Sequence, residues 1–90
     1  MDAQNFAAEL EAAGYAEIET KTLETRSANQ GHAHDSSVRG LVLDGEFIVA
    51  CGGEPRSYRT GDIFEVPAGM PHTEAVGPDG ARILVGRRYA

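Results

Sequence analysis

The chain has 90 residues, of which 41% are hydrophobic, so it is long enough for one globular domain with a small core and too apolar for a disordered tail. Its 14 acidic and 8 basic residues give a formal charge of −6, which argues against the cationic surface that a nucleic-acid partner needs. No apolar run approaches the roughly 18 residues of a membrane-spanning helix, so we expect no membrane partner.

Residues 2–13 are predicted to form a short N-terminal helix. Asp2 can cap its first turn, Phe6 and Leu10 recur at helical spacing, and Gly14 can end it. The acidic start lacks the basic region of a secretory signal, so we expect a cytoplasmic protein. Because the apolar stripe is narrow, we expect the helix to lie across the body of the domain in a packing or subunit contact.

From residue 15 to residue 90, short apolar runs alternate with turn residues, and this pattern predicts an antiparallel all-β barrel or sandwich. Ile18 and Leu23 would fall on opposite faces of a regular strand, so a bend or bulge is expected between them. Neither a linker nor an internal repeat interrupts the chain, and we therefore expect residues 1–90 to form a single domain.

Three hairpins are predicted from turn residues. The stretch SVRGLVLDGEFIVAC contains two apolar runs on either side of Asp44-Gly45, a pair that favours a tight turn because both turn positions need a positive φ. A second hairpin is expected at CGGEPRSY and a third at VGPDGARILVG. The single cysteine, Cys51, excludes an internal disulfide and is expected to be a small buried apolar side chain.

All three histidines of the chain follow glycines or prolines closely. His32 and His34 are two positions apart, so in a strand their imidazoles project from the same face. His72 follows GDIFEVPAGMP, where a short strand over residues 63–66 leads into a rigid turn over residues 67–71. Converging imidazoles are what a transition metal requires, whereas surface or partly buried histidines without a metal are the alternative.

The stretches GHAHDSSVRGLVLDGEF and GDIFEVPAGMPHTEAV resemble the two sequence motifs of the cupin superfamily, over residues 26–88. The resemblance implies a small antiparallel β-barrel of the jelly-roll type, often dimeric, with a metal held inside by the motif histidines. The positions that match the two motifs are His32, His34 and Gly45 in the first, and Gly61, Pro67, Gly69 and His72 in the second.

Three positions depart from the cupin pattern. Val38 stands where the first motif has a glutamate, Val76 where the second has an asparagine, and Arg26 where the first motif begins with glycine. The usual set of three histidines and one glutamate is therefore incomplete. Glu74 shares strand parity with His72, so we predict that it replaces the glutamate as a fourth ligand or acts as a base beside the ligands, the alternative being a surface glutamate.

The remaining predictions for the site concern its lining. We expect Val38, Tyr58 and Val76 to line the pocket, with core packing as the alternative for the tyrosine. Arg87 and Arg88 are expected to be a solvated end of the last strand.

The predicted cofactor is one divalent transition metal, namely Zn, Ni, Fe or Cu, because imidazoles suit these ions better than Mg or Ca. The sequence then predicts a small metalloenzyme that acts on a small molecule. A non-catalytic binding or sensor module, and a barrel that has lost its metal, are the alternatives. Leu41 and Leu43 point outward by parity and would form an exposed apolar strip, so we expect a homodimer.

Overall fold

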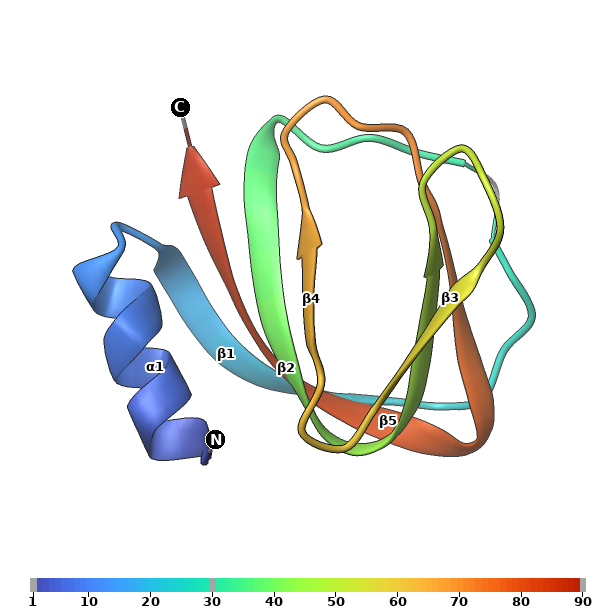
Figure 1. Cartoon of the computed structure of the whole chain (residues 1–90), viewed down its shortest axis with the longest axis horizontal. Coiled ribbons are helices and arrows are strands. Elements are labelled where there is room, and N and C mark those ends of the chain that lie inside the picture. The colour runs from blue at the N-terminus through green and yellow to red at the C-terminus, as the bar shows by residue number, and fades with distance from the viewer. Residues whose placement is uncertain (1, 30, 90) are drawn as a thin grey trace.

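The computed structural model describes residues 2–29 and 31–89. Figure 1 shows strands that curl into a barrel, with one helix on the outside of the sheet. The sheet is antiparallel, with the order β1-β5-β2-β3, and β4 also pairs with β2. The prediction of a small antiparallel β-barrel after one N-terminal helix is confirmed. The elements are α1 (Ala3–Ala12), β1 (Ala16–Leu23), β2 (Ser36–Ala50), β3 (Arg56–Arg59), β4 (Ile63–Val66) and β5 (Thr73–Tyr89).

The helix begins and ends as its sequence predicts. The Asp2 carboxylate accepts a hydrogen bond from the Asn5 backbone N–H at 2.8 Å, which satisfies one of the free donors of the first turn. The helix ends at Ala12, one residue before the predicted end, and Gly14 follows with a φ of 84°. No helix among the described residues is long and apolar enough to cross a membrane.

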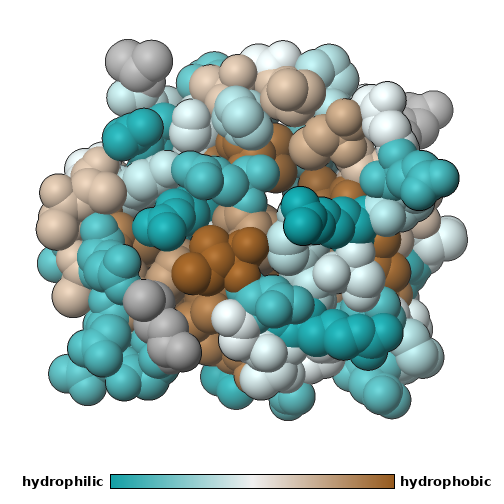
Figure 2. All heavy atoms as spheres, viewed as in Figure 1, coloured by the Kyte–Doolittle hydropathy of each residue, from teal (hydrophilic) through white to brown (hydrophobic). Residues whose placement is uncertain are grey.

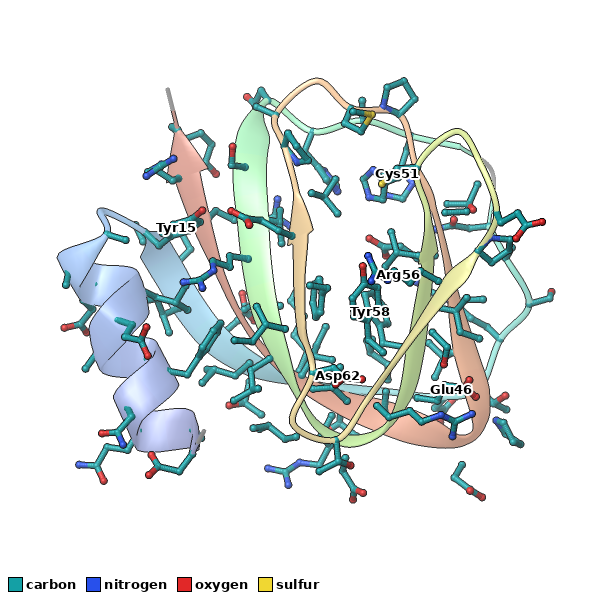
Figure 3. The ribbon with its side chains drawn as sticks, viewed as in Figure 1. Tyr15, Glu46, Cys51, Arg56, Tyr58 and Asp62 are labelled. Carbon is teal, nitrogen blue, oxygen red and sulfur yellow. The ribbon has the colours of Figure 1, made fainter. Side chains whose placement is uncertain are left out.

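The helix builds a second, smaller core on the outer surface of the sheet. Phe6 and Leu10 are fully buried, and they pack against Tyr15, Leu41 and Leu84. Figure 3 shows Tyr15 beside the connection between α1 and β1. The helix therefore covers part of the outward apolar strip from which the homodimer was predicted, and that reason for the dimer falls away. The homodimer itself stays a prediction.

Two of the three predicted hairpins are wrong, because β2 and β5 are long strands that bend without reversing. β2 runs through Asp44-Gly45, and the register against β5 shifts on both sides of this pair. Gly45 has a φ of 77°, and a Cβ there would collide with the Gly80 carbonyl. The positive φ of Gly45, which would suit a tight turn, thus belongs to a β-bulge in β2. Opposite this bulge, the register of β5 is interrupted over residues 77–80.

The hairpin at CGGEPRSY is confirmed, because β2 and β3 pair antiparallel on either side of residues 51–55. Cys51 lies in this connection and is exposed, so the prediction of a buried side chain is wrong. Figure 3 shows it near one end of the barrel. The register of β1 shifts between Ala16 and Glu19, beside a positive φ of 52° at Glu17, but the pairing is regular from Glu19 to Leu23. Ile18 packs against the helix-side core and Leu23 against the inner core, on opposite faces of the sheet, so the prediction of a bend between them is wrong.

The main core fills the inside of the barrel. Phe47 and Phe64 stack with ring centroids 4.9 Å apart, and Gly40 leaves room for the Phe64 ring, which a Cβ would strike. In Figure 2 hydrophobic side chains gather near the middle of the viewed face, between hydrophilic ones. The buried members of this core are Val42, Phe47, Val49, Phe64, Val66, Val76, Ala81, Ile83 and Val85.

Candidate metal centre

The backbone brings the first and last histidines together across two segments. His32 and His72 form an isolated antiparallel bridge, in which each backbone N–H donates to the other carbonyl, at 2.9 and 2.8 Å. The His34 carbonyl accepts a hydrogen bond from the Gly69 N–H at 2.8 Å, which ties the rigid turn over residues 67–71 to the first motif. The predicted turn therefore holds His72 in place immediately before β5.

The three imidazoles converge, as their spacing predicts. The ring centroids of His32 and His34 lie 4.8 Å apart, those of His32 and His72 4.3 Å, and those of His34 and His72 5.2 Å. Glu74 joins them, and one potential ligand atom from each of the four residues lies within 4.8 Å of the others. His72 is only 2% exposed, whereas the other three are half-buried. The predicted ligand set is thus assembled in one place.

Glu74 is held from several sides and is not a surface glutamate. Its backbone N–H donates to the Asn29 side-chain oxygen at 2.8 Å, and its carbonyl accepts from the Asn29 N–H at 3.1 Å. The Arg26 guanidinium donates to carboxylate oxygen Oε1 at 3.2 Å. The second oxygen, Oε2, lies 3.1 Å from His72 Nε2 and 3.9 Å from His32 Nε2.

The contact between His72 and Glu74 is satisfied by a proton or by a metal ion. His72 Nδ1 lies 3.0 Å from the Met70 carbonyl oxygen, which can only accept, so Nδ1 carries the proton of the neutral ring. Nε2 then presents a lone pair to the carboxylate oxygen 3.1 Å away, and two acceptors repel each other at that distance. A proton or a metal ion between them removes the conflict. The donor set therefore fits a transition metal that takes nitrogen and oxygen ligands.

The protonation state of His34 also favours the binding of a metal. Burial lowers its pKa below the ordinary value of 6.5, and Arg87 and the two other histidines lower it further, against a smaller opposing effect of Glu74. The neutral imidazole is the form that binds a metal. The lowered pKa of His34 thus favours the neutral imidazole.

A cavity of about 250 Å³ adjoins the four candidate ligands. Val38 lines it, as predicted, from a position in β2 that pairs with both Val66 and Arg87. Tyr58 and Val76 are not among its described lining residues: the tyrosine packs on the core beside the Phe64 ring, and Val76 is buried within that core. The apolar lining residues are Leu23, Val38, Phe47, Phe64, Val66, Ile83 and Val85.

Three basic side chains of the cavity were missed by sequence reasoning, namely Lys21, Arg26 and Arg87. Arg87 was predicted to be solvated, but it is half-buried and donates to the Ser36 hydroxyl at 3.3 Å. Its parity with the buried Val85 could have revealed this, because alternate residues of a strand share a face. Arg88 is exposed, as expected.

Residues 20–85 match the sequence model of the Cupin domain. The chain belongs to the cupin family. Among solved cupin-like structures, it matches the EutQ protein of Clostridium difficile at 20% identity and a TM-score of 0.71, over 90% of this chain and 62% of that one. An RmlC-like cupin from Shewanella frigidimarina matches at 27% identity and a TM-score of 0.66, over 79% and 63%.

A third solved structure, the DMSP lyase DddQ from Ruegeria pomeroyi, matches at 24% identity and a TM-score of 0.66, over 77% of this cupin and 36% of the lyase. The cupin spans less than two thirds of each of these three solved chains. No functionally curated protein matches it. Only the third of these names states a reaction, and a shared fold by itself selects none.

Proposed function

We propose that this cupin binds one divalent transition metal (Zn, Ni, Fe or Cu) and uses it to act on a small molecule in the barrel cavity. His32, His34, His72 and Glu74 would hold the ion. The observation that supports this most strongly is the contact between His72 Nε2 and Glu74 Oε2, which lie 3.1 Å apart and need a proton or a metal ion between them. Two further imidazoles beside that contact complete a donor set of the kind that transition metals take.

Glu74 would take over the part of the motif glutamate that Val38 cannot play. It comes from β5, two residues after His72, so strand parity brings both side chains to the cavity. The residues around the donors orient them: the Met70 carbonyl fixes the His72 tautomer, and Arg26 holds one oxygen of Glu74.

A metal bound here would supply a Lewis acid to a molecule in the cavity. The chain itself contributes the apolar wall, which excludes water, and the histidines, which fix the position of the ion. A metal with four protein ligands, however, keeps fewer free positions than one with three, and structural zinc sites have four. This count favours a second candidate function, a non-catalytic binding or sensor module of cupin type. Turnover of a substrate panel by the metal-loaded protein distinguishes the two.

The metal is tested by elemental analysis of protein purified without a polyhistidine tag. We expect one transition-metal ion per chain, sharply reduced occupancy in His72→Ala, and an intermediate loss in Glu74→Gln. Glu65→Gln, which removes an exposed carboxylate of β4 outside the cluster, is the matched control and keeps the metal. Circular dichroism confirms that each variant folds. Wild-type protein that contains no metal and takes none up at neutral pH refutes the proposal.

A further inference from the structure

The cavity carries a charge opposite to that of the whole chain. The sequence has 14 acidic and 8 basic residues, yet three basic side chains and one carboxylate line the cavity. The basic ones are Lys21, Arg26 and Arg87, and the carboxylate is Glu74. A cleft of one charge with low-dielectric walls attracts ions of the other sign. The cavity therefore favours an anion, even though the chain as a whole repels one.

Two of these cations have no carboxylate partner among the described residues. Arg26 forms an ion pair with Glu74, but Arg87 donates only to the neutral Ser36 hydroxyl, which is itself 1% exposed. Lys21 is half-buried, and residues 2–29 and 31–89 offer its ammonium group no ion pair. Burying a charge without a partner costs free energy, so a ligand that brings a negative charge would offset this cost.

The rest of the wall is apolar and the space is small. Phe47, Phe64, Ile83 and Val85 lie on the lining, which suits a hydrocarbon portion. The cavity volume, about 250 Å³, falls below the usual range for drug-sized ligands, so the molecule is a small one.

We propose that the ligand is an organic carboxylate with a short apolar body, whose carboxylate is held by Arg87 and Lys21 beside the four candidate metal ligands. This inference deepens the proposed function and rests on it for the place where the molecule binds. A planar guanidinium matches a carboxylate through two parallel hydrogen bonds, and the apolar wall takes the remaining carbon atoms. Phosphate lacks that apolar portion, so we expect it to bind less tightly.

The test is an NMR titration of the chain with butyrate, in metal-free and in zinc-loaded form. Butyramide has nearly the same shape without the charge, and inorganic phosphate has the charge without the apolar body. The variants are Arg87→Gln and Lys21→Met, and the control is Arg82→Gln, which removes an exposed arginine from the same strand, β5. The amide spectrum of each variant shows whether it folds, and zinc binding is measured on each.

We expect butyrate to shift the amide signals of the cavity strands and to bind about tenfold or more weakly to each of the two variants, as the loss of a charge-assisted hydrogen bond implies. Zinc binding stays intact in Lys21→Met, and the Arg82→Gln control binds butyrate like the wild type. Equal affinity for butyramide, tighter binding of phosphate, or an equal loss in the control overturns the inference. Protein that binds zinc but not butyrate refutes the carboxylate alone, whereas protein that binds butyrate but no zinc refutes only the metal.

Discussion

Replacing Arg26 tests whether the candidate metal site depends on a residue that holds Glu74 and is not itself one of the four candidate ligands. The Arg26 guanidinium holds Glu74 Oε1 at 3.2 Å and so turns Oε2 toward His72 and His32. Arg26→Gln removes the ion pair and leaves the carboxylate free to rotate. We expect the site to bind zinc more weakly as a result.

The size of the effect follows from the exposure of the pair. Removing a partner that orients a metal ligand typically weakens binding by about 10–100-fold. The Arg26 side chain is 43% exposed and that of Glu74 23%, so solvent screens the pair and the lower end of the range, about tenfold, applies. Arg26→Lys keeps the charge but loses the planar fork, and an intermediate loss is expected.

A matched control exists in the same chain. Arg59 donates to Glu46 Oε2 at the same 3.2 Å, away from the cavity, so Arg59→Gln removes an equivalent surface ion pair. The assay is competition for zinc with a chelator at pH 7.5, an arbitrary choice above the ordinary pKa of histidine, about 6.5. Zinc affinity of Arg26→Gln within twofold of the wild type, or an equal loss in Arg59→Gln, would show that the orientation of Glu74 by Arg26 plays no part.

Further predictions concern pH, packing and assembly. Burial and Arg87 lower the pKa of His34 below 6.5, so the unfolded chain takes up a proton at this side chain more readily than the folded one. The free energy of unfolding of the metal-free protein should therefore fall as the pH drops through and below 6.5. Denaturant titrations of His34→Gln should show a smaller fall. Gly40→Ala would push a Cβ into the Phe64 ring and should destabilise the fold by about 1–3 kcal/mol, whereas Gly53→Ala, which meets open space, should cost little in thermal melts. The homodimer predicts a dimer mass in light scattering at about tens of micromolar, and a monomer would contradict it.

Local chemistry in the sequence was sufficient for the features that depend on a few neighbouring residues. The Asp2 cap and the hairpin at residues 51–55 follow from side-chain and φ preferences within a single turn. The same holds for the shared face of His32 and His34, because the alternation of a strand is set by the backbone itself. Parity also predicted that Glu74 accompanies His72.

Features that depend on distant pairing were decided by the tertiary structure. Asp44-Gly45 offers the positive φ that a hairpin or a bulge can use, and only the continuous pairing of β2 with β5 made it a bulge. The outward leucine at position 41 was free to meet a second subunit or the chain's own helix, and the packing of α1 selected the helix. The cationic cavity likewise needed β1, β5 and the segment at Arg26 to be brought together. Sequence preferences act over a few residues, whereas contacts between distant segments depend on how the whole sheet closes. This is why the cluster of candidate ligands was foreseen and the charges around it were not.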